Sequence, residues 1–258
     1  GDTKHIVLFP ADPAECFDFA VQAFDLAERF QTPVFVLSDL DIGMNDWMCD
    51  RLTWDDAWRP DRGKVLNATE IAGLQRFSRY HCEDDTGVAA RTLPGVHPGG
   101  AYFVRGSGHD RHAAYTEDAG AYREVVDRLA VKLATAAKAV PAPELNTAGV
   151  ALIGIVSLGG CNAAVLEAVD RLRSQGVEVD YLRIRGFPFA QSVTEFLGSH
   201  DLLFVVEQNR DAQLRSLLAI ETGTPRDRMI PVLDYGGLPL TARCVEESVA
   251  SRLAGVAA

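Results

Sequence analysis

The chain has 258 residues, of which 47% are hydrophobic and 24% charged, values close to those of average soluble globular proteins. This composition excludes an intrinsically disordered protein, and a chain of this length can bury two cores of ordinary size, so we expect two domains. The formal net charge is -11 and there is no Lys/Arg-rich run, so a polyphosphate backbone would be repelled. Nucleic acid is therefore not an expected partner.

The sequence also predicts no membrane partner and no secretion. The longest apolar stretch, Val150 to Leu158, is about half as long as a helix that crosses a bilayer. The first residues lack the basic and apolar regions of a signal peptide. The five Cys are odd in number and form no C-x-x-C pair. We expect a cytoplasmic protein whose thiols are reduced and mostly buried as small hydrophobic side chains.

The first elements predict a strand, a helix and a second strand. His5 to Phe9 is a short apolar run, and Asp12-Pro13 is a helix-capping pair. Apolar residues then recur at helical spacing from Ala14 to Phe30. Val34 to Leu37 is uniformly apolar, as in a fully buried strand of a parallel sheet. Because the chain opens directly on this βαβ unit, we expect its sheet to need strands from elsewhere.

A long irregular stretch, 38–107, follows, and Gly or Pro interrupts it every few residues. Such a stretch usually serves an active site or an interface. Its three Trp side chains are expected to anchor the loop or form an interface rather than stack on a cofactor: Trp47, Trp54 and Trp58. Helical spacing returns over 118–138, and the Pro residues after it predict a linker at about 140–147.

The second half alternates between strands and helices. The expected strands are 150–158, 177–184, 202–207 and 229–233, and the expected helices are 162–175, 190–198, 211–221 and 241–254. This alternation predicts an α/β fold with a parallel sheet and helices on both faces. We expect one domain over 1–140 and a second over 148–258.

Two Gly-rich segments are candidates for ligand binding. Gly159-Gly160 lies between a strand and a helix, where a phosphate could approach. The third glycine and the acidic residue of the dinucleotide fingerprint are missing, so a plain turn is favoured. Ser107, between two glycines, lacks the preceding strand of a hydrolase nucleophile elbow. Because the dinucleotide fingerprint is incomplete, an NAD-dependent dehydrogenase is the weakest alternative for the function.

The segment from His109 to His112 is the densest local group of titratable side chains. Two His three residues apart could bind a metal, but a third ligand at a sensible spacing is missing, so no metal site is predicted. A polar loop that contacts a ligand or another subunit is the favoured interpretation.

Acidic and amide side chains follow two predicted strands at the sheet edge where α/β proteins bind ligands. Asp39 and Asp41 follow the strand that ends at Leu37, and Glu207 and Asn209 follow the strand 202–207. The alternative for each is a structural one, in which the side chain caps a turn or the next helix. Both interpretations stay open.

Several runs resemble the alpha subunit of 2-oxoacid:ferredoxin oxidoreductases, with the 2-oxoglutarate type fitting best. The long first run is Phe9-Pro10, Glu15-Cys16-Phe17-Asp18, Ala23 to Glu28, Gln31 to Val34 and Ser38 to Asn45. The later matches are Arg91 to Gly95, Tyr102 to Asp110, Tyr115 to Asp118 and Val205 to Asn209. The resemblance covers essentially the whole chain.

The resemblance implies a coenzyme A-dependent oxidative decarboxylation of a 2-oxoacid on thiamine diphosphate, with electrons passed to ferredoxin. It implies part of a pyrimidine-binding domain over 1–140 and a transketolase C-terminal-like domain over 148–258. A partner beta subunit would hold the Mg-diphosphate half of the cofactor and a [4Fe-4S] cluster in a heterotetramer.

The sequence departs from the family at its start. The catalytic Glu and the Tyr-Pro-Ile-Thr-Pro segment of the family precede the region where this sequence begins, so we expect a truncated or cleaved alpha subunit with an N-terminal partner portion. No catalytic residue is assigned to this chain. By analogy, Arg105, His109 and Asp110 are substrate-side candidates, and the loop or interface candidates are Asp39, Asp41, Asn45, Glu207 and Asn209. A non-catalytic α/β assembly module is the alternative.

Overall fold

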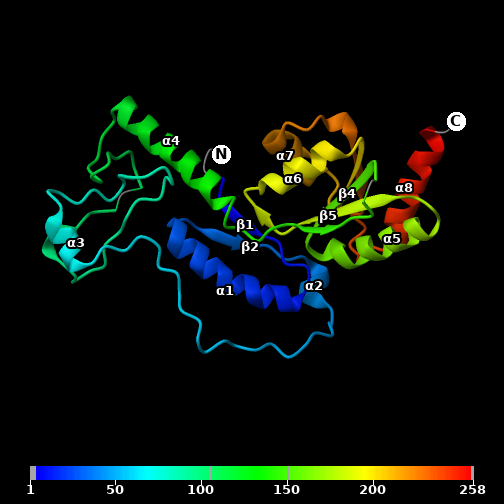
Figure 1. Cartoon of the computed structure of the whole chain (residues 1–258), viewed down its shortest axis with the longest axis horizontal. Helices are drawn as coiled ribbons and strands as arrows, with labels where there is room; N and C mark the ends of the chain where they lie inside the picture. The colour runs from blue at the N-terminus through cyan, green and yellow to red at the C-terminus, as the bar shows by residue number, and fades with distance from the viewer. Residues whose placement is uncertain (1–3, 105, 150, 257–258) are drawn as a thin grey trace. The chain divides into compact units, whose positions relative to one another are not determined.

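A computed structural model describes residues 4–104, 106–149 and 151–256, and Figure 1 shows its elements. The chain divides into two compact units, each of which is described by itself. Unit 1 holds Gln22–Phe35 and Asp55–Ala139 together with the N-terminal residues up to Ile6. Unit 2 holds Val7–Val21, Val36–Trp54 and Val140–Ala258. Each unit therefore collects segments that lie far apart in the sequence.

The larger described sheet lies in unit 2 and has the strand order β3-β5-β4-β7-β8. Its strands are β3 (Glu144–Asn146), β4 (Ile153–Leu158), β5 (Val179–Ile184), β7 (Leu202–Glu207) and β8 (Met229–Leu233). β4 pairs in parallel with β5 and β7, β7 pairs in parallel with β8, and β3 is antiparallel to β5. The predicted parallel sheet is confirmed, while β3 occupies part of the expected linker.

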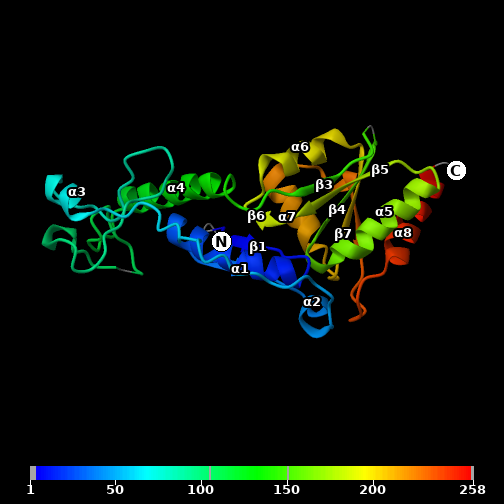
Figure 2. The same ribbon diagram turned by 60° about the horizontal axis from the view of Figure 1, so that its bottom comes forward.

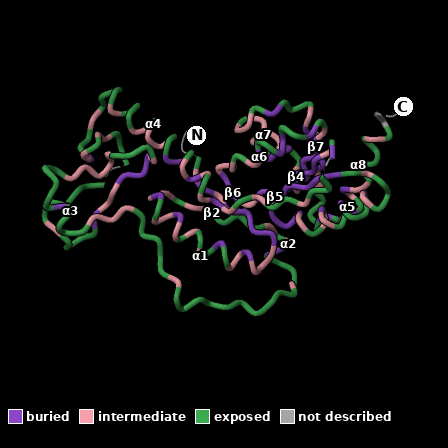
Figure 3. Tube along the Cα trace, viewed as in Figure 1, coloured by how far each residue is buried: buried purple, intermediate pink, exposed green. Residues whose placement is uncertain are grey.

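Helices cover both faces of this sheet because successive strand residues point to opposite sides. The helices are α5 (Asn162–Ser174), α6 (Gln191–Ser199), α7 (Gln213–Thr222) and α8 (Ala242–Val256). Ile155 packs in the core with α5 and α8, whereas the adjacent Val156 packs with α6 and α7. Figure 2 shows α5 and α8 on one side of the strands and α6 on the other. Figure 3 shows buried residues concentrated along β4 and β7.

A second described sheet has the order β2-β1-β6, with β1 (Ile6–Leu8), β2 (Val34–Val36) and β6 (Gly186–Phe187). β6 comes from the second half of the chain and pairs antiparallel with β1. The prediction that 34–37 is a fully buried strand is wrong, since Phe35 is 53% and Leu37 57% exposed. β2 lies at the edge of its sheet, where an apolar run has a neighbouring strand on one side only.

Helix α1 (Pro13–Phe30) begins as predicted, because the Asp12 carboxylate accepts a hydrogen bond from the Glu15 backbone N–H at 2.8 Å. In unit 1, helix α4 (Ala119–Ala136) also matches its prediction, with Asp118 as its cap. The remaining described elements are short: α2 (Leu40–Met44), α3 (Ala68–Gly73), and the 3-10 turns η1 (Pro98–Gly100), η2 (Gly159–Cys161) and η3 (Arg226–Arg228). The stretch 38–107 is therefore largely irregular, as expected.

The three Trp side chains contact neighbouring segments. The Trp47 indole N–H donates to the Asp41 carbonyl at 3.0 Å, and that of Trp58 donates to the Asp25 carboxylate at 3.2 Å. Trp54 meets the ring of Phe17 edge on, with 6.3 Å between centroids. These contacts tie the loop to α1 and α2, as an anchoring role requires.

The Cys side chains are more exposed than predicted. Cys161 is buried, but Cys49 is exposed and the other three are half-buried. The prediction of mostly buried thiols is thus wrong, because Cys49 lies in the irregular segment after α2 rather than in a core. Across the described chain, no helix is both long and apolar enough to span a membrane.

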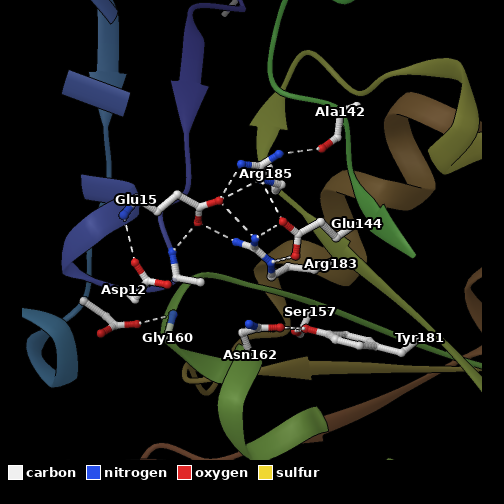
Figure 4. Close-up of polar contacts among 12 residues, drawn as sticks. Asp12, Glu15, Ala142, Glu144, Ser157, Gly160, Asn162, Tyr181, Arg183 and Arg185 are labelled. Carbon is white, nitrogen blue, oxygen red and sulfur yellow. Dashed lines mark hydrogen bonds and ion pairs between the residues drawn. The ribbon is translucent and has the colours of Figure 1, made fainter. Parts of the chain in front are cut away.

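A buried ion-pair network in unit 2 links the first turn of α1 to β5, as Figure 4 shows. Glu15 is 8% exposed and receives two hydrogen bonds from the Arg183 guanidinium, at 2.6 and 3.0 Å. Arg185 and the Ala11 N–H also donate to Glu15, at 2.7 and 2.8 Å. Burial works to raise the pKa of Glu15, but these hydrogen bonds outweigh it and hold the pKa below its ordinary value.

Candidate functional site

A pocket of about 360 Å³ lies within unit 2 at the carboxyl ends of β4 and β7. Open α/β sheets bind ligands at this edge. Its apolar lining is Phe9, Leu37, Leu158, Phe189, Val206, Leu214 and Leu217, and its other lining is Ser38, Asp39, Gly159, Cys161, Glu207, Gln208, Asn209 and Gln213. We call this the sheet-edge pocket. It brings together three of the residues proposed from the sequence, namely Asp39, Glu207 and Asn209.

Asp39 uses both carboxylate oxygens to fix the local backbone. One oxygen accepts from the Ile42 N–H at 3.0 Å and caps α2. The other accepts from the Gly160 N–H at 2.8 Å, which joins the segment before α2 to the turn after β4. The structure therefore shows the capping geometry, and Gly159-Gly160 forms the tight turn that the sequence favoured.

Gly160→Ala is expected to destabilise the fold by about 2 kcal/mol. A Cβ at this position would come within 2.3 Å of an Asp39 carboxylate oxygen, so the hydrogen bond to the backbone could not persist. Chemical denaturation measures the loss. Gly198→Ala is the control, because Gly198 lies in α6 with no atom within 4 Å of the new Cβ. Equal stability of the two variants would contradict the role given to Asp39.

Glu207 and Asn209 both satisfy the N-terminus of α7. Glu207 is 4% exposed, and its carboxylate accepts from the backbone N–H of Leu214 at 2.7 Å and of Arg215 at 3.0 Å. The Asn209 amide donates to the same carboxylate at 2.7 Å and accepts from the Gln213 N–H at 3.2 Å. A buried carboxylate at a helix N-terminus is stabilised by the free N–H groups there. This pair therefore sets the shape of one wall of the pocket.

A second hollow in unit 2 shares Asp39 and Gln208 with the sheet-edge pocket. Its other lining is Leu40, Asp41, Met44, Asn45, Asp234, Tyr235, Gly237, Leu238 and Pro239. Here the Asn45 amide donates to the Asp41 carboxylate. Asp234 and Tyr235 were not selected from the sequence, although they directly follow β8. The strand-end rule that selected Asp39 and Glu207 would have found them.

Cys161 lines the sheet-edge pocket, but it is a poor nucleophile. Burial raises the pKa of its thiol to about 12, with a further contribution from the negative charge of Asp39. We therefore expect alkylation of the folded chain at pH 8 to modify Cys161 at least about tenfold more slowly than the exposed Cys49. Peptide mass spectrometry over time measures both rates. Faster modification of Cys161 than of Cys49 would contradict the raised pKa of the buried thiol.

Of the substrate-side candidates, His109 and Asp110 lie in unit 1, and Arg105 lies outside the described residues. The His109 ring stacks on Tyr80 with 3.9 Å between centroids. Asp110 accepts from the N–H groups of His112 at 2.8 Å and Ala114 at 2.9 Å. Burial acts to raise the pKa of Asp110, yet these bonds lower it overall. Asp110 thus stabilises the turn that directly follows His109.

The His112 ring nitrogen contacts the Ser78 hydroxyl at 2.8 Å. Among the residues that the structure describes, no three His, Cys, Asp or Glu side chains lie where they could hold a metal ion. The site residues proposed from the sequence therefore form two groups. Asp39, Asp41, Asn45, Glu207 and Asn209 belong to unit 2, and His109 and Asp110 belong to unit 1.

Comparisons with known proteins identify relatives of the chain. A family model described as "Pyruvate flavodoxin/ferredoxin oxidoreductase, thiamine diP-bdg" matches residues 1–46. The alpha subunit of 2-oxoacid:ferredoxin oxidoreductase 2 from Aeropyrum pernix is 30% identical over 246 residues, which cover 93% of this chain and 37% of that protein. The 2-oxoglutarate synthase subunit KorA from Methanothermobacter marburgensis is 28% identical over 236 residues, which cover 90% of this chain and 60% of that protein.

A solved structure shares the fold. It is a 2-oxoglutarate:ferredoxin oxidoreductase from Magnetococcus marinus with 2-oxoglutarate, coenzyme A and succinyl-CoA bound, and it aligns with a TM-score of 0.83 and 23% identity over 97% of this chain and 42% of that chain. The expected α/β fold is confirmed. The sequence is related to alpha subunits of 2-oxoacid:ferredoxin oxidoreductases, while spanning 37% and 60% of the length of the two curated relatives above.

Proposed function

We propose that the chain is a portion of the alpha subunit of a 2-oxoglutarate:ferredoxin oxidoreductase. The observation that carries this proposal is the similarity to the alpha subunit of a 2-oxoacid:ferredoxin oxidoreductase over 93% of the chain at 30% identity. The 2-oxoglutarate specificity is supported by the name of a relative with 28% identity. In the assembled enzyme the reaction would be the oxidative decarboxylation of 2-oxoglutarate with coenzyme A, and the electrons would pass to ferredoxin.

The sheet-edge pocket suits the ring end of thiamine diphosphate better than the diphosphate end. About half of the described residues that line it are apolar, and none of them is Lys or Arg. Both carboxylates, of Asp39 and Glu207, already accept backbone hydrogen bonds, and negative charge disfavours a diphosphate. Thiamine diphosphate supplies the carbanion chemistry of decarboxylation when bound. We infer that a beta subunit holds the diphosphate, Mg and a [4Fe-4S] cluster.

The residues of this chain would then shape the pocket and face the substrate. Asp39 and Glu207 fix the backbone around the pocket, and we assign a role in proton transfer to neither of them. Arg105, His109 and Asp110 are proposed to face 2-oxoglutarate. Residues 1–140 are proposed to be part of a pyrimidine-binding domain, and 148–258 a transketolase C-terminal-like domain. An N-terminal alpha-subunit portion would complete the first domain.

The test is a dye-reduction assay on the native complex that contains this chain. We expect 2-oxoglutarate to reduce an oxidised viologen dye only when coenzyme A is also present. Omission of either compound and replacement of 2-oxoglutarate by pyruvate are the controls. Preference for pyruvate would overturn the substrate assignment alone. No reduction with any 2-oxoacid would overturn the enzyme proposal and favour a non-catalytic assembly module, for which the exposed Leu40, Met44 and Leu238 offer an apolar surface.

A further inference from the structure

Unit 1 contains three neighbouring cationic side chains that are largely withdrawn from solvent. Arg128 and Lys132 lie one turn apart on α4, so their side chains share a face of the helix. Arg79 comes from the irregular segment before α4 and contacts Gln31, as Lys132 does. Lys132 is only 6% exposed, which is unusual for a Lys without a paired charge. We call these residues the unit 1 cation cluster.

The cluster bonds only to neutral groups. The Lys132 ammonium donates to the Gln31 carbonyl at 3.3 Å, and Arg128 donates to the Gly87 carbonyl at 2.9 Å. Arg79 donates to the Gln31 side-chain oxygen and lies over the ring of Tyr80, 5.2 Å from its centroid. The Nε atoms of Arg79 and Arg128 are buried without a hydrogen-bond partner in the described structure. Such orphan donors are costly unless something else satisfies them.

Nearby negative charge does not balance the cluster. Within the described ranges, none of the three side chains forms an ion pair with a carboxylate. Three acids line the hollow beside Arg128, namely Asp84, Asp85 and Glu124. Two of them pair with other cations, Glu124 with Arg111 at 3.0 Å and Asp84 with Lys64 at 2.6 Å. The end of α1 beside Gln31 contributes about half a negative charge. The negative charge of Glu124, which acts on Arg128, and the end of α1 therefore compensate the three positive charges only in part.

We propose that Arg79, Arg128 and Lys132 form a binding site for a small phosphate-class oxyanion. A phosphate carries about two negative charges near neutral pH and so offsets the excess better than one carboxylate. Its oxygens can accept from planar guanidinium groups in pairs, and the Lys132 ammonium has two further N–H donors beyond its bond to Gln31. Burial and the two Arg charges lower the pKa of Lys132 to about 8, as expected for a cation that lacks its counter-ion. The unit 1 cation cluster shares no residue with the lining of the sheet-edge pocket, and the proposal does not depend on the proposed function.

Isothermal titration of the full chain with inorganic phosphate tests the proposal, in a chloride buffer of matched ionic strength. We expect one saturable site in the wild type, and affinity at least about tenfold weaker in Lys132→Met and in Arg128→Gln. Arg210→Gln is the charge-matched control, because Arg210 is exposed in unit 2 and pairs with Asp211. Its affinity should equal that of the wild type.

A second titration with glycerol 3-phosphate distinguishes the source of the anion. Tighter binding than inorganic phosphate would support the phosphate group of a larger metabolite, and binding of inorganic phosphate alone would support the free anion. No saturable binding of either compound, or equal affinity in the wild type and both cluster variants, would overturn the proposal. Circular dichroism of each variant confirms that a lost signal does not reflect unfolding.

Discussion

Glu15→Gln is expected to lower the free energy of unfolding by about 3 kcal/mol, because it leaves Arg183 buried with half of its charge compensation. Arg183 is 3% exposed and, among the described residues, would keep Glu144 alone as an ion-pair partner, at 2.7 Å. The Glu144 side chain is 55% exposed, so water screens that pair. Urea denaturation followed by circular dichroism measures the loss.

Glu167→Gln is the matched control for this substitution. Glu167 also pairs with an Arg, but both partners on α5 are exposed, so little change is expected. Adding Arg183→Met to Glu15→Met should cost much less than the sum of the two single changes, since the double variant leaves no buried unpaired charge at these positions. Additive effects would show that the two side chains do not act as a pair.

The same network predicts a pH dependence. The folded-state pKa of Glu15 lies below its ordinary value of 4.5, so the folded chain releases the proton more readily than the unfolded chain. The stabilisation is therefore complete above pH 4.5 and is lost as the pH falls through the folded-state pKa. We expect the difference in stability between the wild type and Glu15→Gln to shrink as the solution is acidified below pH 4.5.

Lys132→Met is expected to stabilise the chain by about 2 kcal/mol at pH 7 in a buffer without phosphate. A fall of the Lys132 pKa from 10.5 to about 8 corresponds to a penalty of about 3 kcal/mol for the charged form. Loss of the hydrogen bond to Gln31 offsets about 1 kcal/mol of the gain. Thermal and chemical denaturation measure the net effect. Lys138→Met, just beyond α4 and exposed, should change stability little.

The sign of this effect can be checked by titration. Between pH 8 and 10.5 the unfolded chain binds more protons at Lys132 than the folded chain, so the wild type gains stability as the pH rises through that window. Lys132→Met should not show this part of the increase in stability. The free energies of unfolding of the wild type and the variant should therefore converge toward pH 10.5. Arg79 and Arg128 stay charged throughout and are common to both proteins. A destabilised variant at pH 7 would mean that another negative group already neutralises Lys132.

The parallel strands of the larger sheet were predictable because each is a short apolar run bounded by a turn, whereas β3 is not an apolar run and lies in the expected linker. The run Leu202–Glu207 is observed with its predicted bounds, and Met229–Leu233 likewise. The partners of the first strand were not predictable. β6 has two residues, and its pairing with β1 joins positions about 180 residues apart, which leaves no local pattern.

The position of the candidate site could be predicted from the sequence, but the hydrogen bonds of its side chains could not. The rule that ligands meet the carboxyl ends of strands selected Asp39 and Glu207, and both line the sheet-edge pocket. The sequence left open whether each carboxylate caps backbone N–H groups or meets a ligand, because the capped residues Gly160 and Leu214 become neighbours only in the folded chain. The burial of Lys132 could not be predicted from helical spacing, because it depends on tertiary contacts such as the one between its ammonium and the Gln31 carbonyl.

We propose that this chain is one component of a thiamine diphosphate enzyme whose diphosphate half is held elsewhere. The most direct measurement is the thiamine diphosphate content of the native complex, compared with calorimetric titration of the isolated chain by the same cofactor. We expect the complex to contain the cofactor and the isolated chain to bind it at least about a hundredfold more weakly. A native complex without thiamine diphosphate, or an isolated chain that binds it as tightly as the complex does, would overturn this proposal.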